Sequence, residues 1–204
     1  MSVAGDTEGG LYTIVLAAGA AARFGSPKQL VRISGRPLLH NTVSNAVQIT
    51  GAATIVVLGA YAAELAPLLG HTPASVLINR EWHEGIGSSI RRGVAALPAA
   101  CSAVMIVLAD QAAVTAQDLQ RLVSAWKRQP ECVAAALYSG STGVPAIFPR
   151  SRFAKLGELR GDVGARRLLQ RSPDRIVRVP MDSAALDIDT PEDLLSLSAG
   201  QQNN

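Results

Sequence analysis

Short apolar runs alternate with longer segments of helical periodicity along this chain. The runs are mostly apolar throughout, which is typical of strands that are buried on both faces of a parallel sheet. Strands are therefore predicted at residues 12–16, 54–58, 75–78, 103–108, 133–137, 144–148 and 175–179.

The segments between these runs predict helices. The clearest is residues 116–128, where apolar residues recur at helical spacing behind Thr115, a residue type that often caps helices. The predicted helices cover residues 37–49, 62–69, 88–97, 116–128, 164–170 and 191–197. This alternation indicates an α/β fold, a doubly wound and mostly parallel sheet with helices on both faces and ligands at the carboxyl ends of the strands.

The chain of 204 residues has the length of one domain, and no repeat or linker divides it. We expect a single domain over residues 11–197, with disordered polar tails at 1–10 and 198–204. The two cysteines, Cys101 and Cys132, have no neighbouring metal-ligand pattern, so they are expected to be free thiols in a reducing compartment.

The charge pattern limits the classes of partner. The net charge is +3, and the basic residues are dispersed among few aromatic ones. Nucleic-acid binding usually needs a denser basic stripe, whereas a small anionic substrate suits this balance. The N-terminus resembles no signal peptide, and no apolar run approaches the ~20 residues of a membrane span. A cytoplasmic protein without nucleic-acid or membrane partners is predicted.

The segment after the first strand combines small residues with two cations. Ala17, Ala18 and Gly19 let a ligand approach the main chain, whose N–H groups can bind oxygens or a base edge. Arg23 offers a planar fork suited to phosphate, and Lys28 offers a compact charge. The glycine spacing matches neither the dinucleotide-binding nor the P-loop pattern. The segment therefore predicts another kind of phosphate-binding loop, the alternative being an ordinary surface loop.

Acidic residues at two places are candidate metal ligands. Asp110 closely follows the buried run 103–108, at the edge of the sheet that carries ligands, and a carboxylate there suits Mg²⁺ beside a triphosphate. Its alternative role is to cap the following turn. Asp187 and Asp189 face the same side of an extended segment, and one or both could complete the site.

These motifs resemble, in order and over nearly the whole chain, those of the MobA-like NTP transferases. Within that group the chain is most similar to the molybdenum cofactor cytidylyltransferases. The segments that carry the resemblance are Leu16-Ala-Ala-Gly-x3-Arg23-Phe-Gly25-x2-Lys28-Gln29-Leu30, Gly35-Arg-Pro-Leu-Leu39, Asn79-x5-Gly85-x2-Ser88-Ser89, Leu108-Ala-Asp110-Gln111, Gly161-Asp162-x-Gly164-Ala165-Arg166 and Asp187-Ile-Asp189-Thr-Pro-Glu-Asp-Leu194.

The resemblance implies roles for individual residues. The implied nucleotide-binding residues are Leu16, Ala17, Ala18, Gly19, Arg23, Lys28, Gly85 and Ser89. The implied catalytic residues are Arg23, Lys28 and Asp110, with Asp110 and Asp189 as Mg²⁺ ligands and Asp187 behind them. The implied acceptor-binding residues are Gly143, Asp162 and Arg166, although Asp162 could equally cap the next helix, just as the hydroxyls of Ser88 and Ser89 could be helix caps.

The implied reaction is transfer of CMP from CTP to the phosphate of a molybdopterin-type cofactor, with release of pyrophosphate and a client molybdoenzyme as a possible partner. The alternatives are a GTP-using guanylyltransferase, which tends to carry glycine in place of Ala18, and a non-catalytic cofactor chaperone for an oxidoreductase. Val144 and Ala112 stand where relatives usually carry His and Pro. These two departures leave the identity of the acceptor open.

Overall fold

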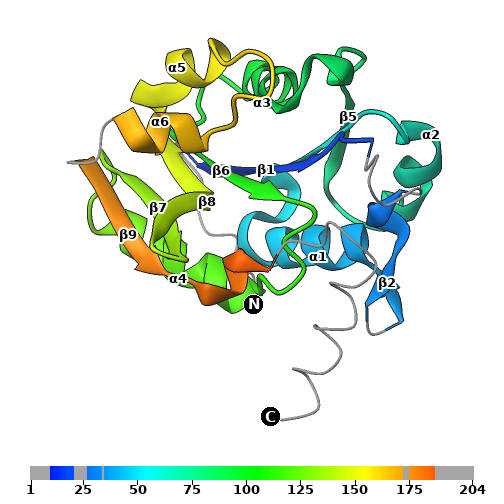
Figure 1. Cartoon of the computed structure of the whole chain (residues 1–204), viewed down its shortest axis with the longest axis horizontal. Coiled ribbons are helices and arrows are strands. Elements are labelled where there is room, and N and C mark those ends of the chain that lie inside the picture. The colour runs from blue at the N-terminus through cyan, green and yellow to red at the C-terminus, as the bar shows by residue number, and fades with distance from the viewer. Residues whose placement is uncertain (1–9, 21–26, 34, 172–174, 187–204) are drawn as a thin grey trace, which may run out of the picture.

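A computed structural model describes residues 10–20, 27–33, 35–171 and 175–186. Its centre is a seven-stranded sheet in the order β5-β4-β1-β6-β8-β7-β9 (Figure 1). Its strands are β1 (Leu11–Ala17), β4 (Thr54–Leu58), β5 (Ser75–Ile78), β6 (Ala103–Leu108), β7 (Val133–Tyr138), β8 (Ser141–Pro149) and β9 (Ile176–Pro180). Neighbouring strands are parallel except where β8 pairs with β6 and β7, so the predicted mostly parallel sheet is confirmed.

The reversal at β8 has a local cause. Only Ser139 and Gly140 connect β7 to β8, and so short a connection can join antiparallel strands but not parallel ones. Both residues have positive φ, 48° and 68°, which is the backbone twist that two-residue hairpin turns require.

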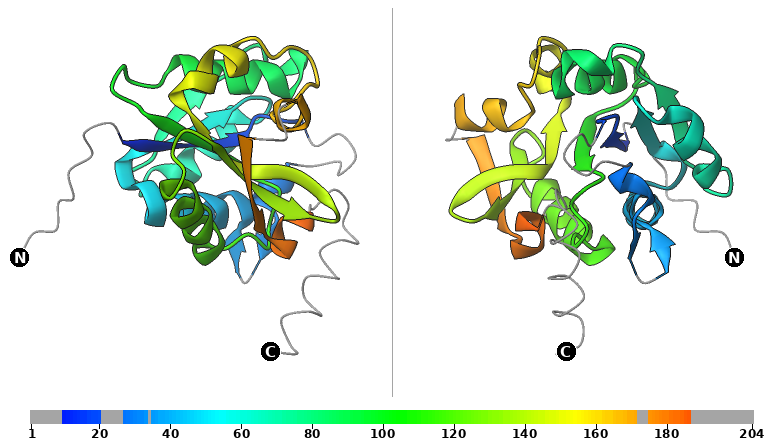
Figure 2. Two further views of the ribbon diagram at one scale, coloured as in Figure 1. Left: turned by 90° about the vertical axis from the view of Figure 1, so that its left-hand side faces the viewer. Right: turned by 45° about the vertical axis from the view of Figure 1, so that its right-hand side comes forward.

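Helices cover both faces of the sheet (Figures 1 and 2). They are α1 (Leu38–Thr50), α2 (Ala62–Leu65), α3 (Ile86–Ala95), α4 (Ala116–Lys127), α5 (Phe153–Gly157) and α6 (Arg166–Arg171). On one face Ile90, Leu156 and Leu169 of α3, α5 and α6 pack on the sheet, and on the other face α1 and α4 do so. A separate hairpin is formed by β2 (Arg32–Ile33) and β3 (Arg36–Pro37).

The structure differs from the sequence prediction in a few elements. Residues 62–69 form α2 followed by a 3-10 segment, because Pro67 lacks the N–H that would continue α-helical bonding. Helix α5 was not expected, since five residues are too few to display a helical period. The predicted helix 191–197 and the two tails lie outside the described residues.

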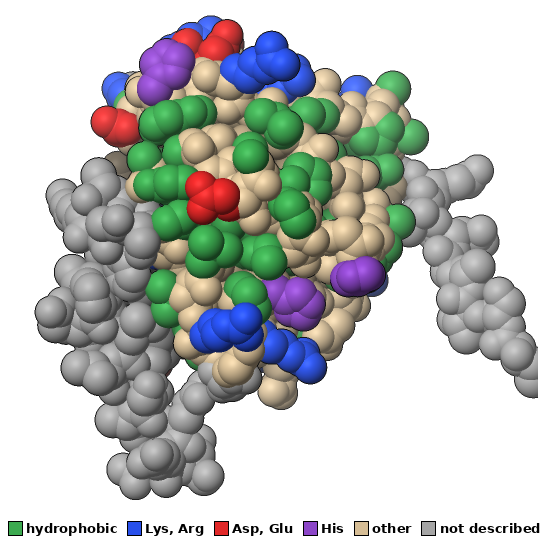
Figure 3. Space-filling view, turned by 90° about the vertical axis from the view of Figure 1, so that its right-hand side faces the viewer, with side chains coloured by type: hydrophobic (Ala, Val, Ile, Leu, Met, Phe, Trp, Pro, Cys, Tyr) green, Lys and Arg blue, Asp and Glu red, His purple; other side chains and the backbone are tan. Residues whose placement is uncertain are grey.

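One edge of the sheet is β5, which pairs with no described strand other than β4. Its side chains Val76 and Ile78 are 38% and 50% exposed. Figure 3 shows this side of the molecule, where hydrophobic side chains are spread between a few charged ones. None of the helices in the described ranges is both long and apolar enough to span a membrane.

Candidate active site

A cavity of about 400 Å³ opens at the carboxyl ends of β1 and β6. This is the edge of the sheet at which a doubly wound fold places its ligands. The residues that line it are Leu16, Ala17, Ala18, Gly19, Ala20, Lys28, Gln29, Trp82, His83, Gly85, Ile86, Ser89, Leu108, Ala109, Asp110 and Asp162.

The loop after β1 is held in place through its carbonyl groups. The buried Gln29 amide donates to the carbonyl oxygens of Ala17 at 3.3 Å and Gly19 at 3.2 Å. The main-chain N–H of Ala60 donates to the Ala18 carbonyl at 3.1 Å, and the Tyr61 hydroxyl donates to that of Ala20 at 3.0 Å. Four consecutive carbonyl groups are thus fixed, so the cavity wall they form is preorganised.

Lys28 and Asp110 form an ion pair on this wall. The Lys28 Nζ donates to Asp110 Oδ2 at 2.7 Å, and the two side chains are only 15% and 25% exposed. The other oxygen, Asp110 Oδ1, is buried and has no hydrogen-bond partner within the described ranges. A buried carboxylate oxygen without a partner is unfavourable unless a cation or a donor reaches it. Asp110 therefore has the capacity for one more ligand.

The segment between β5 and α3 is organised by Asn79. The side-chain oxygen of Asn79, Oδ1, accepts a hydrogen bond from the Glu81 main-chain N–H at 3.0 Å. This bond fixes the orientation of the Asn79 side-chain amide. The amide nitrogen then donates to the hydroxyls of Ser88 at 2.8 Å and Ser89 at 3.0 Å. Ser88 donates onward to the Gly85 carbonyl at 2.9 Å, whereas no acceptor for the Ser89 hydroxyl occurs among the described residues. Ser89 lines the cavity and is thus left as a hydrogen-bond donor toward a ligand.

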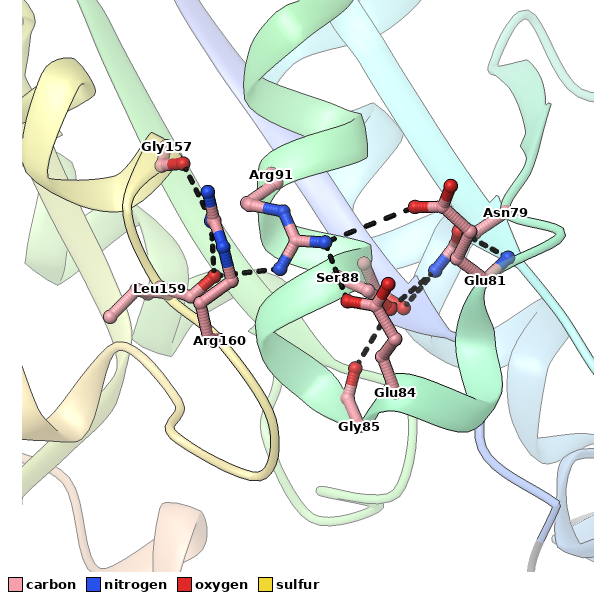
Figure 4. A network of polar contacts seen from close by, with 10 residues as sticks. Asn79, Glu81, Glu84, Gly85, Ser88, Arg91, Gly157, Leu159 and Arg160 are labelled. Atoms are coloured by element: carbon pink, nitrogen blue, oxygen red, sulfur yellow. Dashed lines mark hydrogen bonds and ion pairs between the residues drawn. The ribbon is translucent and has the colours of Figure 1, made fainter.

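Arg91 ties this segment to the loop between α5 and α6 (Figure 4). Its guanidinium donates to the Glu84 carboxylate at 2.7 Å and to the Leu159 carbonyl at 2.8 Å. The hydrogen bond from Arg91 lowers the pKa of the exposed Glu84 carboxyl. The two segments also touch directly, because the Gly87 N–H donates to the Gly161 carbonyl at 3.0 Å.

The structure brings most of the predicted site residues together. Leu16, Ala17, Ala18, Gly19, Lys28, Gly85, Ser89, Asp110 and Asp162 all line the cavity. Gly143 and Arg166 are not among the lining residues, and Arg166 instead donates to the Ser141 hydroxyl on β8 at 2.7 Å. Arg23, Asp187 and Asp189 lie outside the described residues. Within the described part of the chain no group of three or more His, Cys, Asp or Glu side chains could hold a metal.

Several residues that organise the site received no role in the sequence analysis. They are Gln29, Asn79, Trp82, Arg91 and Gln111. Gln29 and Trp82 line the cavity, and hydrogen bonds from Gln29, Asn79, Arg91 and Gln111 hold the segments around it. Gln111, for example, donates to the Val144 carbonyl at 2.9 Å and to the Ala184 carbonyl at 3.0 Å, so it fixes the turn that carries Asp110. Gln29 and Gln111 directly follow proposed site residues, and that adjacency was the available signal.

One protein family and several known proteins are similar to this chain. A family model described as the MobA-like NTP transferase domain matches residues 13–192. Nicotine blue oxidoreductase of Paenarthrobacter nicotinovorans is 29% identical, over 95% of this chain and 99% of that protein. Purine catabolism protein PucB of Bacillus subtilis (strain 168) is 30% identical, over 90% of this chain and 93% of that protein.

Among solved structures, Rv0371c from Mycobacterium tuberculosis H37Rv superposes with a TM-score of 0.81 at 26% identity, over 94% of this chain and 98% of that one. A second structure of Rv0371c, in complex with manganese, superposes with a TM-score of 0.76 at 24% identity, over 92% and 97%.

Proposed function

The chain belongs to the MobA-like NTP transferase family, and from that premise we propose that it transfers CMP from CTP to the phosphate of a molybdopterin-type cofactor. The observation that carries the proposal is the ion pair between Lys28 and Asp110 inside a preorganised cavity at the carboxyl ends of β1 and β6. A cation for phosphate and a carboxylate for a metal are the two groups that nucleotidyl transfer requires from the protein at this place.

Asp110 and Asp189 are the proposed ligands of a Mg²⁺ ion. The fit rests on Asp110 Oδ1, which is buried and unpartnered within the described ranges. Hard divalent cations prefer such carboxylate oxygens, and manganese is bound by the related Rv0371c. When bound, the ion would neutralise charge on the triphosphate.

The side chains position and neutralise the reacting groups. A terminal phosphate oxygen of the acceptor attacks the α-phosphorus of CTP, a new oxygen–phosphorus bond forms, and the bond to the β-phosphate oxygen breaks so that pyrophosphate leaves. A phosphate nucleophile is already ionised at pH 7, so no protein base has to remove a proton. Lys28 and Arg23 balance the charge of the phosphates, and the loop of residues 16–19 holds the nucleotide. Gly143, Asp162 and Arg166 are the proposed contacts with the acceptor.

The fixed hydrogen-bonding polarity of the cavity supports CTP over GTP as the substrate. The Ser89 hydroxyl oxygen accepts a hydrogen bond from the Asn79 amide. Its hydrogen can therefore be donated to a base oxygen such as the cytosine O2. Ala18 lines the cavity, and its methyl group packs toward Gly59, where any side chain would collide with it. We propose that Ala18 restricts the base indirectly, because its packing toward Gly59 and the hydrogen bond from Ala60 to its carbonyl fix the position of the loop. A base that places no acceptor atom at the position of Ser89 would leave this donor unsatisfied.

The similarity to nicotine blue oxidoreductase favours a second candidate function, an oxidation–reduction of a small organic substrate. Against it, the glycine spacing of the first loop does not match the dinucleotide-binding pattern. A guanylyltransferase and a non-catalytic cofactor chaperone are the other rivals, and both are outcomes of the same experiment.

The test is a panel of the four NTPs with purified molybdenum cofactor and Mg²⁺, scored for pyrophosphate and for the dinucleotide product. We expect release of pyrophosphate with CTP. Turnover should be lost in Asp110→Asn but not in the matched surface variant Asp182→Asn. Preference for GTP would support the guanylyl alternative. Binding of the molybdenum cofactor without release of pyrophosphate would favour the chaperone. Oxidation of a nicotinamide cofactor by a dye, without release of pyrophosphate, would favour the oxidoreductase.

A further inference from the structure

A second cavity, of about 320 Å³, lies under α5 and α6, near the amino ends of β7 and β9. Val133 and Ile176 begin β7 and β9 and pair with each other, whereas the first cavity lies at the carboxyl ends of β1 and β6. Its lining residues are Val133, Phe148, Arg152, Lys155, Glu158, Leu159, Arg160, Val163, Arg167, Leu168, Leu169 and Ile176, and we call this space the basic cavity.

The lining divides by chemistry. Val133, Phe148 and Ile176 belong to the hydrophobic cluster of this face of the sheet, and the leucine and valine side chains of the covering segments extend the apolar part. The charged part consists of four cationic side chains, Arg152, Lys155, Arg160 and Arg167, against one carboxylate, Glu158. An apolar hollow with an excess of positive charge suits a molecule that is apolar at one end and anionic at the other.

The cationic side chains differ in how they are held. The Arg160 guanidinium donates to the carbonyls of Gly157 at 3.2 Å and Leu159 at 3.0 Å, so it is fixed in place (Figure 4). The Lys155 and Arg167 side chains make no hydrogen bond or ion pair with any residue in the described ranges. They are exposed on α5 and α6, on either side of the hollow, and can turn toward a bound anion.

We infer that the basic cavity is a second binding site, for a small organic anion in which an aromatic or aliphatic body carries a phosphate, sulfonate or carboxylate. The body occupies the apolar part and the anionic group lies between Lys155 and Arg167. The volume is that of a small-molecule pocket. The site is separate from the first cavity, which we call the nucleotide cavity after its proposed ligand. The loop between α5 and α6 directs Asp162 to the nucleotide cavity and Arg160 and Val163 to the basic cavity.

The probe for this site is 1-anilinonaphthalene-8-sulfonate, followed by its fluorescence with the natively folded protein. We expect saturable binding of one molecule per chain, weakened about tenfold or more in Lys155→Glu and in Arg167→Glu, as the loss of a charge-assisted contact predicts. Lys127→Glu, on the opposite face of the sheet, is the matched control and should bind normally. The neutral analogue N-phenyl-1-naphthylamine should bind more weakly, and its affinity should not depend on Lys155 or Arg167.

Two further measurements distinguish the basic cavity from the nucleotide cavity. Binding should persist in Asp110→Asn and at saturating CTP, with its stoichiometry unchanged. Complete displacement by CTP would place the probe in the nucleotide cavity and overturn the inference. Unsaturable binding, or equal affinity in the wild type and in both charge-reversal variants, would overturn it as well. Neither result depends on whether the protein turns over CTP.

Discussion

At the scale of single residues, the Lys28–Asp110 ion pair is the proposed centre of the chemistry in the nucleotide cavity. Lys28→Ala removes the ammonium that we place on the phosphates, and the loss of a charge-assisted contact costs about 1.5–3 kcal/mol, or roughly ten- to hundredfold in kcat/KM for CTP. Lys127→Ala, an exposed lysine on α4, is the control. Steady-state kinetics and thermal unfolding are measured together. Lower stability with unchanged kinetics would assign Lys28 a structural salt bridge only.

The two neighbouring serines allow a matched comparison of base recognition. Ser89 is the residue that we propose donates its hydroxyl hydrogen to the base, whereas Ser88 donates its own to the Gly85 carbonyl. Ser89→Ala should lower kcat/KM for CTP about ten-fold and narrow the preference over GTP, because one donor to the base is lost. Ser88→Ala should mainly reduce the free energy of unfolding. The idea fails if the nucleotide preference is the same in both variants.

At the scale of secondary-structure elements, the start of α4 depends on one carboxylate. Asp118 and Thr115 form a reciprocal capping box, and Asp118 also accepts from Arg121 at 2.6 Å and from the Ser183 hydroxyl at 2.9 Å. Burial raises the pKa of Asp118, but the hydrogen bonds from Thr115, Arg121 and Ser183 outweigh it and hold the pKa below its usual value.

A lowered pKa means that the ionised form stabilises the fold. The contribution of Asp118 is therefore complete above the ordinary carboxyl pKa of about 3.9 and is lost as the pH falls through the lower folded value. Asp118→Asn should reduce the free energy of unfolding by about 1–2 kcal/mol at pH 7. Chemical denaturation between pH 3 and 7 checks this, because the difference from wild type should shrink at the acidic end. A difference that does not vary with pH would contradict the assignment.

The segment before α3 depends on a glycine for two separate reasons. Gly85 has a φ of +102°, and a Cβ there would lie 2.5 Å from the Gly161 carbonyl carbon and 2.6 Å from its oxygen. Gly85→Ala should therefore displace the segment or the loop that carries Asp162, and raise KM for CTP. Gly140→Ala separates the two effects, because Gly140 has a φ of +68° with nothing within 4 Å of a Cβ. It should cost about 1 kcal/mol in stability and leave KM unchanged. Equal kinetics in the two variants would refute the steric part.

At the scale of the whole molecule, the sheet was predictable and the network between its loops was not. The strands are dense apolar runs, so the positions of β1, β4 and β6 follow from the sequence, and the ends of parallel strands converge at one edge. That is why Lys28 and Asp110, 82 residues apart, could be expected in the same site. The partners of Arg91 could not be expected, because its bond to the Leu159 carbonyl joins helix α3 to a loop 68 residues further along the chain, whose path no local pattern specifies.

The basic cavity illustrates the same limit. Along the chain the basic residues are dispersed, which disfavoured an extended anionic partner. Only the packing of α5 and α6 onto the same face of the sheet brings Lys155 and Arg167 over one hollow, and α5 was too short to be recognised from its periodicity. Charge that is dispersed in the sequence can thus be concentrated in space.

The loop of residues 159–163 lies between the two cavities and contributes residues to the lining of both. A ligand that moves this loop from one cavity therefore also changes the wall of the other cavity. By thermodynamic linkage, the factor by which CTP changes the affinity for an anion in the basic cavity equals the factor by which that anion changes the affinity for CTP. We expect a finite factor different from one, measured by calorimetric titration of each ligand with and without the other. A factor of one would mean that the loop stays rigid when either ligand binds. With any other value of this factor, the concentration of an anion that binds only in the basic cavity would change the fraction of the protein that has CTP bound.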